Sequence, residues 1–431
     1  MSNSVLLFTL DYTKMKRIFI SIHYLEIGGA ERSLIGLLNA LDYTKYEVNL
    51  FVYENRGEFM KLIPKEVHLL PEIKSYAAIE KPMVQALKEG QIGVVAGRLL
   101  SKLQYVLYKW QHHPKEDSGL FQYVADCVNP VLPSLKHLGE YDLAISFLTP
   151  HNVVRDKVGA KRKYAWIHTD YTTISVNVKK ELPVWAAFDK IFAVSEDVKK
   201  TFIQVFPSLK DKIEVFENIL SPKFIREQAE VGIDRNGLES IGLEFRGKSL
   251  ESQIQESSLN PQLSTLNFLS VGRYTSAKNF DNVPFICKLL VEKGLKFKWY
   301  MIGFGGDEAL IRSNIEKAGM QDVCILLGKK ENPYPYMKAC DIYIQPSRYE
   351  GKAVTVREAQ ILCKPVIITN YATSASQVKN GVDGIIVPQG NEQTAEGIYT
   401  FVQDKALQEQ IITYLQSHDY GNEDEVVKLE E

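Results

Sequence analysis

Short apolar runs alternate with amphipathic stretches along most of this chain, so the pattern predicts strands that alternate with helices. Residues 18–22 form a buried apolar run, and residues 46–53 form the next one. Between them, leucines recur at the spacing of one helix face: Leu34, Leu37, Leu38 and Leu41. This order is a βαβ unit, and it implies a parallel sheet covered by helices.

The alternation continues in two blocks. In the first, further strands are expected at residues 143–147, 163–167, 190–194 and 212–216, and residues 75–138 are mostly helical in pattern. In the second, strands are expected at residues 266–271, 297–302, 323–327, 341–345, 365–369 and 384–387. We therefore expect an α/β protein with two tandem Rossmann-like, doubly wound domains. They would face each other across a cleft, with ligands at the carboxyl ends of the strands.

A change in composition sets the expected domain boundaries. Residues 227–263 are polar, rich in Glu, Ser, Gln and Gly, and carry little periodicity. We expect an N-terminal extension, a Rossmann-like domain, a linker or insertion, a second Rossmann-like domain, and C-terminal helices that can pack back on the first domain. Their expected ranges are 1–14, 15–220, 221–264, 265–400 and 401–431.

Overall composition narrows the classes of function. The 431 residues suit two domains better than one core. The net charge of −2 argues against nucleic acid or another polyanion as a partner. The five cysteines form no C-x-x-C pair, which is typical of a reducing compartment. No apolar run approaches the roughly 20 residues that span a bilayer. The sequence therefore predicts a cytoplasmic protein.

The stretch over residues 349–359 follows an expected strand and opens an amphipathic helical run. Glu350 and Glu358 bracket this strand-to-helix turn. A helix N-terminus there would offer backbone N–H groups to an anion, and the flanking carboxylates can hold hydroxyl groups. This arrangement suits a sugar nucleotide, in which a diphosphate joins two hydroxyl-rich ends. A surface helix with two solvated Glu residues has the same spacing.

Three further loops follow expected strands. Gly28 and Gly29 precede the first helix, where glycine lets the backbone approach an anion, although a plain tight turn would look the same. Arg273 and Lys278 follow a strand and can neutralise a diphosphate. Alternatively, Arg273 pairs with a carboxylate and Lys278 is solvated. Gly303 ends another strand, where it would shape the rim of a nucleotide pocket or form a simple turn.

A histidine, His168, ends the expected strand at residues 163–167. At a strand end its side chain can face a ligand, and a purely structural histidine fits the same position. No D-x-D pair follows an expected strand. We therefore expect neither a metal site nor a cofactor.

Taken together, these residues resemble a known family. Their order is the one seen in family-4 retaining glycosyltransferases of the GT-B fold: Gly28-Gly29-Ala30-Glu31, His168, Arg273 with Lys278, and Glu350-x7-Glu358. The resemblance covers nearly the whole chain outside residues 1–14 and 227–263. Residues 352–369 look most like bacterial enzymes that build capsular or exopolysaccharide repeat units. Many members carry Gly-Phe-Gly after the first Glu, whereas this chain has Gly-Lys-Ala, so the donor sugar stays open.

The resemblance implies a role for each candidate residue. The first domain would bind the acceptor, and the second would bind the nucleotide sugar. Glu358 would bind ribose hydroxyls, and Glu350 would contact hydroxyls of the transferred sugar. Arg273 and Lys278 would neutralise the departing diphosphate, and His168 would hydrogen-bond the donor sugar. The remaining donor-binding positions are Gly28, Gly29, Gly303, Ala353, Val354 and Thr355, several of them through backbone N–H groups.

The expected reaction is a retaining, metal-independent transfer of a hexose or N-acetylhexosamine from a UDP-sugar to a glycan acceptor on a lipid carrier. A covalent route of the glycosidase kind needs two carboxylates about 5 Å apart. Eight helical residues rise about 12 Å, so Glu350 and Glu358 do not fit it. Peripheral membrane contact is expected from residues 102–110 and from a basic group, although a solvated face also fits each. The basic group comprises Arg155, Lys157, Lys161, Arg162 and Lys163.

Two other functions are compatible with this sequence. One is a sugar-nucleotide epimerase of the same two-domain architecture, which would need further acid and base residues. The other is a protein that binds a nucleotide sugar without turnover. The reaction products distinguish these possibilities from sugar transfer.

Overall fold

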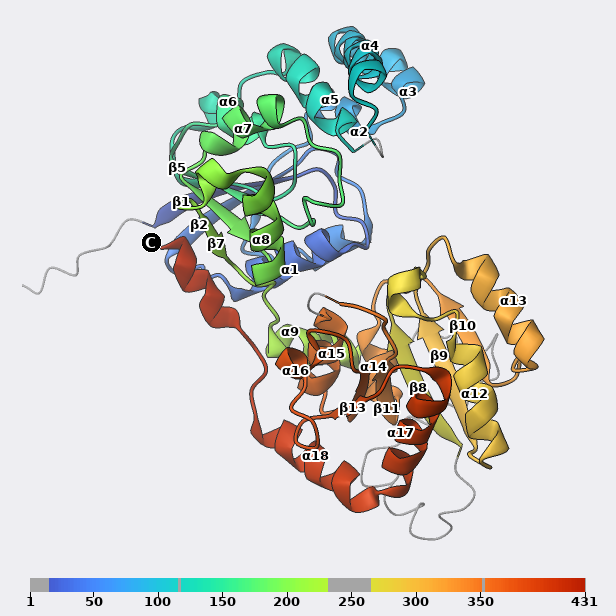
Figure 1. Ribbon diagram of the computed structural model, residues 1–431. Coiled ribbons are helices and arrows are strands. Elements are labelled where there is room, and N and C mark those ends of the chain that lie inside the picture. The colour runs from blue at the N-terminus through green and yellow to red at the C-terminus, as the bar shows by residue number, and fades with distance from the viewer. Residues whose placement is uncertain (1–14, 115–117, 232–264, 351–352, 431) are drawn as a thin grey trace, which may run out of the picture. The chain divides into compact units, whose positions relative to one another are not determined.

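The computed structural model describes residues 15–114, 118–231, 265–350 and 353–430 (Figure 1). The chain divides into two compact units, unit 1 (Met1–Asn218 with Asp424–Glu431) and unit 2 (Ile219–Glu423). The expected extension over 1–14 and most of the expected linker lie outside the described residues. Residues at the start of that linker instead form helix α9 (Pro222–Glu230), which places Ile225 and Ala229 in the core of unit 2.

Over the described residues, unit 1 contains a parallel seven-stranded sheet in the order β3-β2-β1-β4-β5-β6-β7. Its strands are β1 (Lys16–Ile22), β2 (Tyr46–Val52), β3 (His68–Leu69), β4 (Tyr141–Ser146), β5 (Ala160–Ile167), β6 (Lys190–Ala193) and β7 (Ile213–Val215). The predicted strands are confirmed, and β3 is an addition. The doubly wound α/β class is therefore confirmed for this unit.

Helices cover this sheet. They are α1 (Gly29–Ala40), α2 (Lys74–Glu80), α3 (Met83–Lys88), α4 (Ile92–His112), α5 (Leu120–Val128), α6 (Asn152–Lys157), α7 (Val178–Ala186) and α8 (Glu196–Val205). The 3₁₀ turns are η1 (Glu58–Leu62), η2 (Asn129–Val131), η3 (Lys136–Leu138) and η4 (Pro207–Leu209). One core joins Phe19 and Ala165 of the sheet to Val94, Val154 and Trp185 of the helices. Helices α2 to α5 gather at one end of the unit (Figure 1).

The described part of unit 2 contains a parallel six-stranded sheet in the order β10-β9-β8-β11-β12-β13. Its strands are β8 (Leu266–Val271), β9 (Phe297–Ile302), β10 (Cys324–Gly328), β11 (Ile342–Gln345), β12 (Val366–Thr369) and β13 (Ile385–Val387). Its helices are η5 (Ser276–Lys278), α12 (Val283–Glu292), α13 (Glu308–Ala318), α14 (Tyr334–Ala339), α15 (Val354–Ile361), α16 (Ser374–Gln377), α17 (Asn391–Gln403) and α18 (Lys405–Ser417).

Two cores lie on opposite faces of this second sheet. Successive strand residues point to opposite faces, so Phe268 packs with α12, α13 and α17 while its neighbour Leu269 packs with α9, α14 and α15. Trp299 and Tyr300 of β9 divide in the same way. Helices on both faces of a parallel sheet confirm the predicted doubly wound arrangement.

The C-terminal segment is shared between the units. Helix α18 belongs to unit 2, where Ile411 and Leu415 are buried in the core. The turn η6 (Glu423–Leu429) belongs to unit 1 from Asp424 onward. There, Lys428 Nζ donates to the Val215 carbonyl at 2.8 Å, and the Tyr46 hydroxyl donates to Glu430 Oε1 at 2.6 Å. Only the last residues of the chain therefore pack on the N-terminal sheet.

Each sheet has one point where the strand order reverses. In unit 1 this switch point lies between β1 and β4, and in unit 2 it lies between β8 and β11. The loops that leave neighbouring strands there run in opposite directions and leave a crevice at the carboxyl edge. The candidate residues of each unit should therefore lie at this edge of its own sheet.

Candidate active site

Unit 2 brings Lys278 and Glu350 together at its switch point. Lys278 lies in the loop after β8, and Glu350 lies in the loop after β11. Lys278 Nζ is 2.5 Å from Glu350 Oε1, and the two side chains are 20% and 11% exposed. The alternative in which Lys278 is merely solvated is wrong. The pair fixes one positive and one negative charge at the edge where a ligand is expected.

A buried polar network holds the Glu350 carboxylate. Glu350 Oε1 accepts from Ser347 Oγ at 2.6 Å and from Gln345 Nε2 at 3.2 Å. Gln345 Oε1 in turn accepts from the Tyr343 hydroxyl at 2.7 Å. Gln345 and Ser347 are fully buried, so these bonds are needed to offset their desolvation. The sequence analysis missed both residues; the signal was a glutamine that closes an otherwise apolar strand.

Arg348 ties the loop after β11 to the loop after β8. Its guanidinium makes a two-pronged contact with Asp281, at 2.9 and 2.7 Å, and its backbone N–H donates to the Ala277 carbonyl. Asn279 Nδ2 donates to the Pro346 carbonyl at 2.9 Å. These contacts keep the Lys278 loop in register with Glu350. Sequence reasoning missed Arg348, because nothing local indicates its distant partner.

Of the two cations in the loop after β8, Arg273 is the one whose side chain is not held by another described residue. Its side chain is exposed and forms no hydrogen bond or ion pair with any other described residue. The alternative in which Arg273 pairs with a carboxylate is therefore not seen among those residues. Arg273 and Lys278 leave the same loop after β8, so an anion there would meet one free cation and one that is shared with Glu350.

Gly303 packs against the loop that carries Arg273. A Cβ atom placed on Gly303 would lie 1.9 Å from the Gly272 carbonyl oxygen, so any side chain would push the loops after β8 and β9 apart. Glycine is needed here for the close approach of two backbones. The structure thus places Gly303 at the carboxyl edge of β9, next to β8.

The N-terminus of α15 offers fewer backbone donors than predicted. The Ala353 N–H donates to Gln377 Oε1 at 3.0 Å, and Ala353 is buried, so the predicted anion contact through this amide would have to displace Gln377. Val354 and Thr355 form the first helical turn, whose amides have no acceptor inside the helix. The Thr355 hydroxyl donates to Gln345 Oε1 at 3.3 Å.

Glu358 is fully buried on α15. Its Oε1 accepts from the hydroxyl of Tyr334, on α14, at 2.8 Å. The predicted contact with ribose hydroxyls requires an accessible carboxylate. A nucleotide could reach Glu358 only if a neighbouring group moved aside.

In unit 1, the loop that contains Gly28 and Gly29 lies beside the carboxylate of Glu31. A Cβ atom on Gly28 would lie 2.1 Å from Glu31 Oε2, so the Glu31 side chain folds back over the start of α1. Burial raises the pKa of Glu31. A phosphate at Gly28 would meet this carboxylate, which disfavours the predicted anion contact at that residue as arranged. Gly29 is different, because a Cβ atom there would meet no described atom within 4 Å.

His168 follows β5 and is neutral. Its Nε2 lies 2.9 Å from the Phe147 carbonyl oxygen. A carbonyl can only accept, so Nε2 carries the proton and Nδ1 is left as the acceptor. Burial lowers the pKa of His168 to about 4. His168 can therefore accept a hydrogen bond from a hydroxyl near pH 7, but it is not a proton donor there.

We predict that His168 makes the fold sensitive to acid. The unfolded chain binds a proton at this histidine below about pH 6.5, whereas the folded state resists protonation down to about pH 4. Its stabilising contribution is complete above pH 6.5 and is lost as the pH falls toward 4. His168→Gln keeps an N–H for Phe147 and does not titrate, so it should recover about 3 kcal/mol of unfolding free energy at pH 4.

Urea unfolding at pH 7 and pH 4 measures this effect. Burial also raises the pKa of Glu181 to about 7, which acts in the opposite sense. That contribution is the same in the wild type and the variant, so it cancels in their difference. His137→Gln, at an exposed histidine, is the matched control. Equal acid sensitivity of His168→Gln and the wild type would show that His168 is not buried in its neutral form.

Two further histidines border the unit 1 switch point. His23 follows β1 directly, and its Nδ1 lies 2.9 Å from Glu80 Oε1. His151 follows β4, and its Nδ1 lies 2.7 Å from Ser146 Oγ. Burial lowers the pKa of His151 well below its usual value. Sequence reasoning did not single out either residue, although His23 directly follows an apolar strand run, which is a usable signal.

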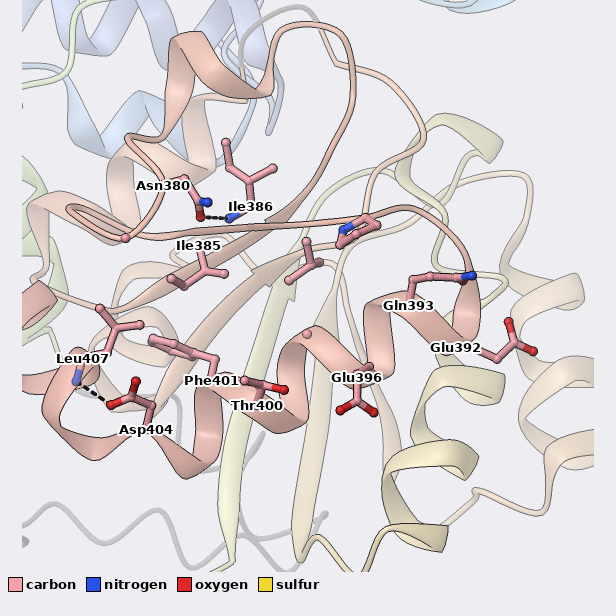
Figure 2. Close-up of a pocket in the computed structure, with 14 residues that line it drawn as sticks. Asn380, Ile385, Ile386, Glu392, Gln393, Glu396, Thr400, Phe401, Asp404 and Leu407 are labelled. Atoms are coloured by element: carbon pink, nitrogen blue, oxygen red, sulfur yellow. Dashed lines mark hydrogen bonds between the residues drawn. The ribbon is translucent and has the colours of Figure 1, made fainter.

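A pocket of about 770 Å³ lies elsewhere in unit 2, beside the edge strand β13 and helices α17 and α18 (Figure 2). Figure 2 shows Asn380 accepting from the Ile386 backbone N–H, at 2.8 Å. The described residues that line the pocket include no Lys or Arg but include Glu392, Glu396 and Asp404. This charge disfavours a diphosphate. The switch point of unit 2, and not this pocket, is therefore the better candidate for an anionic donor.

The two remaining expectations concern a metal site and a membrane-spanning segment. No group of three or more His, Cys, Asp or Glu side chains in the described part of the chain is arranged to hold a metal ion. Within the same residues, no helix combines the length and the apolar character needed to cross a bilayer.

Comparison with known proteins identifies the C-terminal part of the chain. Residues 252–418 match the family model described as Glycosyl transferases group 1. This range contains Arg273, Lys278, Glu350 and Glu358. It is a group 1 glycosyltransferase domain. The predicted family resemblance is confirmed for this domain.

Two curated relatives share parts of this sequence. The amylovoran biosynthesis glycosyltransferase AmsK of Erwinia amylovora is 28% identical over 141 residues, which are 31% of this chain and 35% of AmsK. The N-acetylgalactosamine-N,N'-diacetylbacillosaminyl-diphospho-undecaprenol 4-alpha-N-acetylgalactosaminyltransferase of Campylobacter jejuni is 23% identical over 202 residues, 46% of this chain and 50% of that protein. The chain thus spans half or less of the length of these relatives.

A solved structure extends the comparison to both units. Anabaena Alr3699/HepE, in complex with UDP and glucose, aligns with a TM-score of 0.58 at 15% identity, over 94% of each chain. At this identity the likeness concerns the fold alone. It confirms that the two parallel-sheet units have the GT-B fold.

Proposed function

We propose that this protein is a glycosyltransferase of polysaccharide biosynthesis that moves a sugar from a nucleotide diphosphate sugar to a glycan acceptor. The Lys278–Glu350 pair at the switch point of a group 1 domain carries this proposal. A cation beside a carboxylate, with Arg273 exposed on the same loop, matches a ligand that joins a diphosphate to a hydroxyl-rich sugar.

The proposed donor is a UDP-linked hexose or N-acetylhexosamine. UDP is supported by the fold likeness to HepE, whose structure contains UDP and glucose. Arg273 and Lys278 would contact the diphosphate, and Glu350 would accept hydrogen bonds from sugar hydroxyls. Glu358 would hold the ribose. The neutral His168 would offer Nδ1 to a hydroxyl of the sugar.

The proposed reaction retains the configuration of the sugar. The bond between the anomeric carbon and the diphosphate oxygen breaks, and the acceptor oxygen bonds to that carbon on the same face. The acceptor proton passes to a diphosphate oxygen. Negative charge grows on the departing diphosphate, and Arg273 and Lys278 stabilise it. As Lys278 turns toward the diphosphate, Glu350 stays held by Ser347 and Gln345 and becomes free to accept from the sugar.

We also propose that the transfer needs no metal or other cofactor, because the two cations supply the charge that balances the diphosphate. Activity should then be the same with and without a chelator such as EDTA. Loss of activity in EDTA that added Mg²⁺ or Mn²⁺ restores would contradict metal independence.

The proposed acceptor is a glycan on a lipid diphosphate carrier, on the cytoplasmic side of a membrane. This is supported by the Campylobacter jejuni relative, whose name describes a diphospho-undecaprenol acceptor. Such an acceptor lies at a membrane surface, so the protein would also need a face that docks there.

Product analysis with labelled UDP-sugars and a lipid-linked glycan tests the proposed function. We expect release of UDP together with a labelled lipid-linked product of retained configuration. An isomerised nucleotide sugar would identify an epimerase instead. Tight UDP-sugar binding without any product would identify a non-catalytic binding protein. Either of these results would overturn the proposal.

A further inference from the structure

We propose that the outer face of helix α4 inserts into the surface of an anionic lipid bilayer. This face, the α4 surface, consists of Leu99, Leu100, Leu103, Val106, Leu107 and Trp110, all of them exposed. Leu99, Leu103, Val106 and Trp110 follow one another at helical spacing and form one continuous stripe. The proposal goes beyond sugar transfer, because docking can be measured with no donor present.

Helix α4 differs from an ordinary surface helix because it carries apolar side chains on its outer face as well as on its buried face. An ordinary helix buries its apolar stripe and exposes its polar face. Here the buried face includes Val94, Val95 and Tyr105, and yet Leu103 is 60% exposed and Trp110 is 76% exposed on the outer face. Folding of unit 1 therefore does not explain these apolar side chains. A contiguous exposed patch of this kind marks an interaction surface.

Neighbouring helices extend the apolar area. Val84 and Leu87 of α3 and Phe121 of α5 are also exposed, each by more than half. Helices α3 and α5 pack directly against α4 at the same end of unit 1 (Figure 1). Exposed apolar side chains therefore occur on three helices that pack together at this end of unit 1.

Charge favours an anionic bilayer over other occupants. The 21 residues of α4 include Arg98, Lys102 and Lys109 but no Asp or Glu. Lys102 is exposed beside the apolar stripe, and Lys88 is exposed at the end of α3. Their long stems can lie along acyl chains while the ammonium groups reach lipid phosphates. The nearby Glu89 is already paired with Lys81, at 3.0 Å.

Helix α4 should lie on the membrane and not cross it. It is long enough in residues, but it carries Arg98, Lys102 and Lys109 along its length, and no described helix is long and apolar enough to span a bilayer. A basic flank, an apolar face and a terminal Trp are typical of a helix that lies in the plane of the interface.

The second basic group predicted from the sequence is less suited to docking. Arg155 pairs with Asp156 at 2.7 Å, and Lys161 pairs with Asp142 at 2.7 Å. Lys163 Nζ donates to the Arg155 carbonyl, and Lys157 Nζ donates to the Leu132 carbonyl. These cations already have partners within unit 1, so the α4 surface is the better candidate for the membrane contact.

Trp110 provides a direct probe of docking. The chain has four Trp residues, and Trp166, Trp185 and Trp299 are at most 1% exposed. Vesicles of phosphatidylcholine with about 30% phosphatidylglycerol should shift the Trp110 emission to the blue and protect it from acrylamide at least about fivefold. Trp110→Phe should abolish this change. An unchanged wild-type spectrum at saturating vesicle concentration would overturn the proposal.

Sedimentation with the same vesicles tests the apolar face. Leu103→Glu with Val106→Glu should lower the bound fraction at least about tenfold, because carboxylates resist insertion. Val291→Glu with Leu310→Glu, at exposed apolar positions of unit 2, is the matched control and should bind like the wild type. Equal melting temperatures would show that both double variants are folded.

Two results would overturn the proposed membrane docking and leave the proposed sugar transfer unaffected. One is equal vesicle binding by the wild type and the α4 variant. The other is a wild-type dimer, detected by light scattering, that the α4 variant converts to a monomer while neither protein binds vesicles. The latter would assign the α4 surface to a second copy of the chain. Transfer to a water-soluble acceptor analogue should persist in the α4 variant, so failure of docking and failure of catalysis are distinguishable.

Discussion

Lys278→Ala is expected to lower kcat for sugar transfer about 10²–10³-fold, the usual loss when one preorganised charge is removed from a developing anion. Lys278 is held at the unit 2 switch point by its contact with Glu350, and Arg348 and Asp281 fix the two loops that carry this pair. The ammonium group therefore needs little reorganisation to meet the diphosphate. Steady-state kinetics with the preferred UDP-sugar measure the loss.

A second set of variants separates a role in charge stabilisation from a role in holding Glu350. If Lys278 only balanced the Glu350 charge, Lys278→Ala with Glu350→Gln would recover most of the activity. We expect no recovery, because the diphosphate would still lack its cation. Lys288→Ala, at an exposed lysine of α12, should behave like the wild type. Wild-type kcat in Lys278→Ala with Arg273→Ala would remove the phosphate-clamp argument altogether.

The strands were predictable because both sheets are buried and parallel. Apolar runs such as residues 266–271 and 297–302 are bounded by polar residues, and β8 and β9 have the same limits. The edge strand β3 has only two residues and leaves no periodic signal. Helix α9 was not predicted from the sequence, for a different reason. It buries only a few apolar residues, including Ile225 and Ala229, within a polar stretch that looks like a linker.

The location of the candidate site was predictable, but its contacts were not. Parallel strands bring their carboxyl ends to one edge, so residues that follow strands could be grouped from the sequence alone. The partner of each side chain depends on distant loops. Lys278 and Glu350 are 72 positions apart. The Ala353 amide is taken by Gln377, and Glu31 covers Gly28. No local pattern indicates these contacts, which decide whether a group is open to a ligand.

Glu358→Gln is expected to weaken UDP binding about 10- to 100-fold. Hydrogen bonds to a charged group contribute about 1.5–3 kcal/mol, and each 1.4 kcal/mol is a factor of ten in affinity. Glutamine can still accept from the Tyr334 hydroxyl, so the packing of α14 on α15 should survive. The loss would then report the carboxylate charge that the ribose hydroxyls need. Titration calorimetry with UDP measures the affinity.

Because the buried Glu358 is hydrogen-bonded to Tyr334, Tyr334→Phe is the control for this experiment. The Tyr334 hydroxyl occupies Glu358 Oε1 at 2.8 Å, so ribose and tyrosine compete for the same carboxylate. Tyr334→Phe removes the competitor and keeps the charge, so it should leave UDP affinity unchanged or make it tighter by up to about tenfold, since a hydrogen bond to a charged group contributes about 1.5 kcal/mol or more. Wild-type affinity in Glu358→Gln, with weaker binding in Tyr334→Phe, would make Glu358 a structural partner of α14 and place the ribose elsewhere.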